Sequence, residues 1–199
     1  MSNLRVNSLT NINGTGTITL PTGNVLRGTD AGSIYCPGSI VQVVNNFFLT
    51  QSSIAVPASY TTFTDIPYFN AIITPKYNTS TILVQARWFG EFADQTATWD
   101  TMFGVKRNGV AVGYPPSTGA AQGIAMASIS YYGNDASSTP ETMNLTYVDS
   151  PATTSPITYQ ICVSSTIAHT LYTNRCVGGT GASPYELGTC MLTLMEIGA

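Results

Sequence analysis

Two different patterns of apolar and polar residues divide the chain at residue 36. Before it, single apolar residues recur every two or three positions between Thr, Asn and Gly, with a Gly/Thr run at 13–17. Such short extended pieces, each with one or two apolar residues and a turn, cannot bury those side chains within one chain. We therefore expect residues 1–36 to form an extended stem in which three chains intertwine. The apolar positions of this stem are Leu4, Val6, Leu9, Ile12, Ile18 and Leu20.

From residue 37 to residue 199 the pattern is that of a compact domain built from short strands. Residues 60–64 alternate polar and aromatic side chains with the period of two that a half-buried strand shows, and 81–89 is expected to be a central strand. The other strands are expected at 40–44, 71–73, 124–132, 143–148, 157–164 and 190–197, with a hairpin at 102–112. Eight or nine strands bounded by Gly, Pro, Asn or Ser predict an all-β, two-sheet antiparallel sandwich of the jelly-roll kind.

Two local signals sharpen this prediction. The pair Asn108-Gly109 supplies the positive φ angles that a type I′ hairpin turn needs, which places a turn there. In the last strand both faces are largely apolar, so we expect one face against the core and the other against a neighbouring subunit. Trp88 lies in the expected central strand and is predicted to be a core residue.

The composition supports a β-rich chain with a weakly charged surface. Charged residues make up 9% of the chain, against about 25% in typical soluble domains. Thr, Val, Ile and Tyr favour strands, while good helix formers are few. The net charge is −3 and the basic residues are scattered, which argues against nucleic acid as a partner. With no signal-peptide pattern and no long apolar run, we expect neither standard secretion nor membrane insertion.

The four cysteines and the single histidine offer little material for a metal or redox site. Cys36, Cys162, Cys176 and Cys190 include no C-x-x-C pair. Reduced thiols are favoured over disulfides, because Cys162 and Cys190 lie in apolar runs where a free cysteine packs as a small hydrophobe. A structural zinc site is not expected, since His169 is the only histidine and no ligand spacing is present. We expect no metal and no cofactor.

Candidate catalytic groups are also few. No G-x-S-x-G elbow precedes His169, so a hydrogen-bonded loop histidine is favoured over a member of a catalytic triad. Glu91, Asp94 and Asp100 lie around Trp99, a composition that a glycoside hydrolase or a calcium site also uses. A polar loop between two strands is the favoured interpretation of these acids. We therefore expect no catalytic residue and no enzymatic activity.

Aromatic side chains in loops are better candidates for function than the acids, since aromatic rings stack on sugars and anchor protein contacts. The loops at 114–119 and 131–135 carry most of these candidates. Packing of the loop tyrosines against a neighbouring subunit of a trimer is the alternative interpretation. The candidate surface-binding residues are Trp99, Tyr114, Tyr131 and Tyr132.

Four stretches in succession carry a resemblance that covers nearly the whole chain. They are residues 4–9 with the Gly/Thr run to 21–23, residues 37–44, residues 73–84 and residues 192–197. In this order and spacing, the chain resembles short fibre-like virion proteins of tailed phages that infect cyanobacteria and other aquatic bacteria. The resemblance implies a homotrimer with an intertwined N-terminal stem and an outward-facing β-sandwich head at residues 37–199.

The resemblance also implies a structural protein of the virion, assembled in the cytoplasm of a bacterial host. A tail-fibre or receptor-binding protein for host attachment is the first expectation, and a capsid cement or decoration protein that stabilises the shell is the alternative. The stem residues are then expected to anchor the protein to other virion proteins. The head loops are expected to meet a host surface glycan or an envelope receptor, and low charge suits neutral glycans. Three identical heads convert weak single contacts into stable adhesion.

Overall fold

The computed structural model describes residues 21–28, 34, 36–116, 119–128, 138–179 and 185–199. The chain consists of two units, Met1–Ile34 and Tyr35–Ala199. In the described part of the first unit, the backbone N–H of Asn24 donates to the carbonyl of Pro21 over 3.0 Å and closes a turn. Gly23 takes φ +89° in this turn, a conformation that favours glycine. The second unit contains all the described strands and is called the head below.

In its described residues, the head is built from strands with one short 3₁₀ helix, η1 (Gln95–Asp100). The β-branched and aromatic residues of the chain supply these strands, and Gly, Pro, Asn and Ser lie between them. The strands are β1 (Ile40–Phe48), β2 (Ser52–Val56), β3 (Ser59–Ile73), β4 (Thr81–Phe92), β5 (Thr101–Arg107), β6 (Val110–Val112), β7 (Ala125–Met126), β8 (Glu141–Asp149), β9 (Ile157–Ser165), β10 (His169–Thr173) and β11 (Cys190–Ile197).

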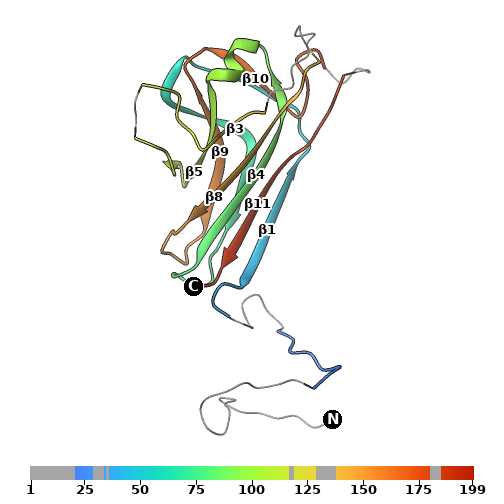
Figure 1. The fold of residues 1–199 in the computed structure, drawn as a ribbon, viewed down its shortest axis with the longest axis vertical. Coiled ribbons are helices and arrows are strands. Elements are labelled where there is room, and N and C mark those ends of the chain that lie inside the picture. Colours follow the sequence, from blue (N-terminus) through green and yellow to red (C-terminus); the bar gives the residue numbers. More distant parts are fainter. Residues whose placement is uncertain (1–20, 29–33, 35, 117–118, 129–137, 180–184) are drawn as a thin grey trace. The chain divides into compact units, whose positions relative to one another are not determined.

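Two antiparallel sheets pack against each other (Figure 1). In the first sheet, β4 pairs with β8 along one edge and with β11 and then β10 along the other. Strands β1 and β2 continue this sheet outward from β11 and β10. The second sheet has the order β3-β9-β5, with β6 and β7 on the far edge of β5. The predicted all-β, two-sheet antiparallel sandwich is confirmed, while the intertwined trimer stays a prediction.

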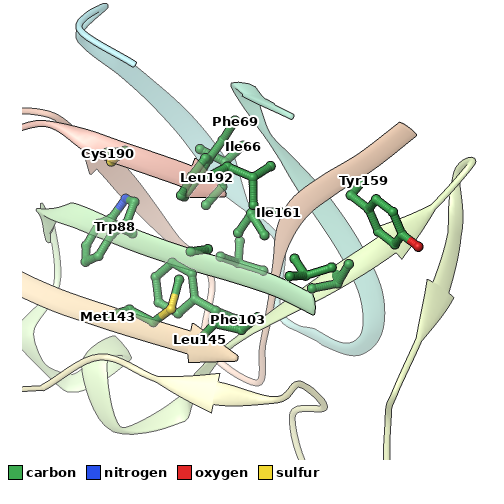
Figure 2. Packing of buried hydrophobic residues seen from close by; sticks show 14 of the residues in the cluster. Ile66, Phe69, Trp88, Phe103, Met143, Leu145, Tyr159, Ile161, Cys190 and Leu192 are labelled. Carbon is green, nitrogen blue, oxygen red and sulfur yellow. The ribbon is translucent and has the colours of Figure 1, made fainter. Parts of the chain in front are cut away.

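The core lies between the two sheets and includes Trp88 (Figure 2). Trp88 is fully buried, which confirms its predicted place in the core. Its ring centroid lies 5.0 Å from that of Phe103 on the opposite sheet, and its Nε1–H donates to Thr173 Oγ1 over 3.0 Å. Full burial of one such side chain stabilises a fold by roughly 1.5–3 kcal/mol. This packing holds the two sheets face to face.

Most of the predicted strands are present, but their limits differ. The expected central strand at 81–89 is β4, which pairs along both edges. The segments 60–64 and 71–73 belong to one long strand, β3, whose register with β9 shifts twice at bulges. Of the strand expected at 124–132, β7 covers Ala125–Met126, and residues 129–132 lie outside the described residues.

Two strands were not predicted, β2 and β10, and they pair with each other. Each is only five residues long, so neither has enough alternation to be recognised alone. Because β10 begins at His169, the expectation of a loop histidine is wrong. The two segments become strands by pairing across a large sequence separation.

The predicted hairpin turn is confirmed. Asn108 and Gly109 have φ angles of +49° and +83°, and Arg107 pairs with Val110 on either side of them. The Asn108 side chain also accepts a 2.8 Å hydrogen bond from the backbone N–H of Thr158 in β9. Local turn chemistry therefore determined this part of the second sheet.

Candidate functional site

The three acids predicted to cluster around Trp99 have separate structural roles. Glu91 is buried in β4 and accepts hydrogen bonds from the backbone N–H groups of Thr139 and Val177. Asp94 caps η1 by accepting from Thr96, and these bonds lower the pKa of its carboxyl. Asp100 accepts a 2.8 Å bond from the hydroxyl of Thr166. These contacts support the interpretation of the three acids as parts of the local polar structure, and not as the pair of catalytic carboxyl groups of a glycosidase.

Two further acids lie buried and hold elements together. Asp149 in β8 accepts two hydrogen bonds from Arg107 of β5, at 2.9 and 3.0 Å, and one from the hydroxyl of Tyr159 at 2.6 Å. Glu196 in β11 accepts from the backbone N–H of Lys76 over 2.8 Å. The hydrogen bonds of both carboxylates are therefore made within the fold.

His169 is buried against residues that no substrate reaches. Its Nδ1 lies 2.9 Å from the carbonyl of Ile167, so Nδ1 carries the proton and donates it. Its Nε2 lies 3.4 Å from Thr101 Oγ1, which is itself 3.2 Å from Ser165 Oγ. Thr101 and Ser165 are fully buried, and burial lowers the pKa of His169. This cluster is a neutral, buried hydrogen-bond network.

The four cysteines are free, and three of them are buried. Both Cys162 and Cys190 are fully buried, as predicted, and Cys190 belongs to the core between the sheets. Desolvation raises the pKa of both to about 11 and that of Cys176 to about 12. Thiols with such high pKa values are poor nucleophiles at neutral pH.

Across the described ranges, no three His, Cys, Asp or Glu side chains gather closely enough to hold a metal ion. Among the same residues, no helix has the length and apolar character needed to cross a membrane.

The side chain of Tyr114 packs against the head and does not project freely into solvent. Its ring lies 4.4 Å from that of Phe63, centroid to centroid. Its hydroxyl donates to the carbonyl of Val105 over 3.1 Å and lies 3.3 Å from Cys162 Sγ. Gly104 lies directly beneath, since a Cβ there would be 2.1 Å from the tyrosine hydroxyl. Its half-buried ring covers the outer side of the second sheet, and its hydroxyl is engaged within the head.

The other predicted site residues are placed only in part. Trp99 lies in η1 with 66% of its surface exposed. Among the described residues, no ring contact joins Trp99 to Tyr114, whose ring packs on Phe63. Tyr131 and Tyr132 lie outside the described residues. So do the stem positions Leu4, Val6, Leu9, Ile12, Ile18 and Leu20.

The structure assembles a different candidate site on the outward side of β8, β4, β11 and β1, here called the outer face. Alternate side chains of a strand point to the same side of a sheet, and residues paired in register lie side by side. The pairing therefore forms rows of side chains that cross all four strands. The four strands lie next to one another in Figure 1. The first row is Asn144, Arg87, Met191 and Phe47. The second is Thr146, Gln85, Thr193 and Asn45, and the third is Val148, Leu83, Met195 and Val43.

Amides and hydroxyls fill the second row, between two rows with apolar members. Thr193 Oγ1 donates to Asn45 Oδ1 over 2.7 Å, which fixes one end of the row. Gln85 and Thr146 are exposed at the other end. Arg87 is the charged member of the three rows. A surface of this kind offers hydrogen bonds and apolar contact with little net charge.

Two hollows on the outer face share Arg87 and together form what is called the Arg87 groove. The first is lined by Gln85, Ala86, Arg87, Asn144, Leu145, Thr146 and Met191. The second is lined by Arg87, Phe89, Thr142, Gly188 and Thr189.

Local packing explains the shape of the second hollow. A Cβ at Gly188 would lie 2.3 Å from the Phe89 ring, so only glycine lets the chain approach that ring so closely. Arg87 Nη2 donates to the carbonyl and hydroxyl oxygens of Thr189, at 3.2 and 3.1 Å. The guanidinium is thereby held at the junction of the two hollows.

The Arg87 groove suits binding and not catalysis. Its side chains offer guanidinium, amide and hydroxyl groups beside the apolar Met191, and no titratable acid or base lines it. Sequence reasoning missed this site, although residues two positions apart in a strand, such as Gln85 and Arg87 in the expected strand at 81–89, share one face. The missing information was the pairing of β4 with β8, which puts Asn144 opposite Arg87.

No protein-family model matches this chain, and the search of curated proteins finds no match.

Proposed function

We propose that this chain is a structural protein displayed on a bacteriophage virion, and that its head attaches the particle to the host surface. The observation that carries the proposal is the outer face, where amides, hydroxyls and apolar side chains cross four strands with Arg87 as the charged member. Such a surface hydrogen-bonds and packs against carbohydrate without performing chemistry. The resemblance to short fibre-like virion proteins agrees with this role.

Several acids and the histidine are engaged in hydrogen bonds within the fold, which supports a binding role over an enzymatic one. Glu91, Asp149 and Glu196 accept hydrogen bonds inside the fold. Thr101 and Ser165, the hydroxyls near His169, are fully buried. A hydrolase requires an acid or a nucleophile that substrate reaches.

A homotrimer with an intertwined stem is part of the same proposal. Exposed apolar side chains on and after β1 support contact with a second chain: Val43, Phe47 and Leu49 are 47%, 62% and 72% exposed. Contiguous exposed apolar residues mark interaction surfaces in soluble proteins. Three heads held together, repeated around a virion, turn modest affinities into stable adhesion. Stem contacts with other virion proteins complete the attachment.

Localisation on intact virions tests this proposal. Gold-labelled antibody raised against residues 37–199 is applied to purified particles and viewed by electron microscopy, with antibody against an unrelated protein as control. Label confined to the tail supports host attachment. Label spread over the capsid shell replaces it with the decoration or cement role, and absence of label from the particle refutes a virion protein.

A further inference from the structure

In the part of the chain that the structure describes, Arg87 differs from Lys106 and Arg107 in having no acidic partner. Lys106 pairs with Asp65, and Arg107 pairs with Asp149. Arg175 donates to the carbonyls of Cys176 and Val177 and stacks over a tyrosine ring. Among the described residues, no carboxylate lies within ion-pair distance of Arg87. A protein of net charge −3 therefore presents an uncompensated cation at the centre of its groove.

The guanidinium is also held in place before any ligand arrives. Both of its hydrogen bonds to Thr189 come from Nη2, which leaves the donors of the other two guanidinium nitrogens for a ligand. Positioning a long side chain in advance reduces the entropy lost on binding. Planar guanidinium groups recognise carboxylates through paired, charge-assisted hydrogen bonds.

Uncharged donors and acceptors surround this cation. Asn144 lies directly opposite Arg87 across the β4–β8 pair, and Gln85 and Thr146 form the neighbouring pair. Met191 supplies an apolar contact in the same hollow. The hollows on either side of Arg87 extend the site along the sheet. One carboxylate flanked by several hydroxyls matches this set of groups.

We propose that the Arg87 groove binds an acidic saccharide, with a uronate carboxylate on the Arg87 guanidinium and sugar hydroxyls on Gln85, Asn144 and Thr146. This inference rests on the proposed role in host attachment and names its ligand class. A polyphosphate or a nucleic acid is disfavoured, because phosphate binding needs several clustered cations and this face has one. A neutral saccharide alone leaves the guanidinium without a partner.

The test titrates the full chain by calorimetry with a short oligogalacturonate and with its methyl ester, which has the same hydroxyls and no charge. We expect the acid to bind more tightly than the ester and its binding to weaken as salt rises. Arg87→Gln should weaken binding of the acid by about tenfold to a hundredfold and leave the ester unchanged. Arg87→Lys should recover only part of the loss, because it keeps the charge and not the planar fork.

A matched control separates the groove from general surface charge. Lys76→Gln removes the same charge from an exposed side chain elsewhere on the head and should leave binding unchanged. Equal binding of acid and ester, or an equal loss in the Lys76 and Arg87 variants, overturns the acidic-saccharide assignment. If the methyl ester binds as tightly as the acid and the antibody labels the tail of the virion, this inference fails while the proposed role in host attachment stands. Absence of binding to either probe overturns the inference, and only the localisation then decides the attachment role.

Discussion

Gly104 is the position where a single added carbon tests how Tyr114 packs. A Cβ at Gly104 would lie 2.1 Å from the Tyr114 hydroxyl oxygen and 2.5 Å from its Cε1. Real Cβ atoms essentially never approach another atom closer than 3.0 Å. Gly104→Ala must therefore push the tyrosine ring off the sheet or bend β5.

The size of the effect follows from the contacts that are lost. Overpacking of a well-packed site destabilises a protein by about 1–3 kcal/mol. Displacing Tyr114 also breaks the hydrogen bond from its hydroxyl to Val105, which contributes about 1 kcal/mol. We expect Gly104→Ala to lower the free energy of unfolding by about 2–4 kcal/mol.

Urea unfolding followed by tryptophan fluorescence measures this loss in two backgrounds. In the wild-type background, Gly104→Ala should lower the free energy of unfolding by the full amount given above. In the Tyr114→Ala background the obstacle is gone, so adding Gly104→Ala should change the free energy of unfolding by less than about 0.5 kcal/mol. If the glycine substitution destabilises both backgrounds equally, Tyr114 does not cover Gly104 and the packing argument is refuted.

Two predictions concern pH and assembly. Because burial lowers the pKa of His169 below that of the unfolded chain, about 6.5, the neutral histidine contributes stability that is complete above that value. This stability is lost as pH falls through the unfolded pKa toward the folded one. The urea midpoint should therefore drop less between pH 7.5 and pH 5 in His169→Gln than in the wild type, and identical drops would contradict the assignment. Deleting residues 1–30 should weaken the proposed trimer, measured as mass by light scattering at micromolar concentration. Full trimer mass after this deletion would show that the head alone drives association.

Several features of the fold were predicted because their causes are local. The positive φ angles at Asn108 and Gly109 need no distant contact, and the turn forms as expected. The run 81–89 was expected to be a central strand, and it belongs to β4, whose buried face carries Trp88. By contrast, β2 and β10 become strands through pairing with distant segments, since β2 pairs with β10 and β10 pairs also with β4.

The candidate site was harder to predict, since exposure depends on what packs over a residue. Tyr114 was expected in a surface loop, but Gly104 leaves room for its ring against the sheet. His169 was expected in a loop and begins a buried strand. Nothing adjacent in the sequence to either residue signals these environments.

Sequence alone determined the class of this protein: β-branched and aromatic residues, short alternating segments and turn residues specify an all-β chain with a weakly charged surface. Tertiary structure decided where the side chains of the proposed Arg87 groove meet. Arg87 and Asn144 are separated by 57 positions and lie opposite each other only through the β4–β8 register. That register depends on burying the inward side chains of both strands in one core, because a shift of one residue would reverse every side chain.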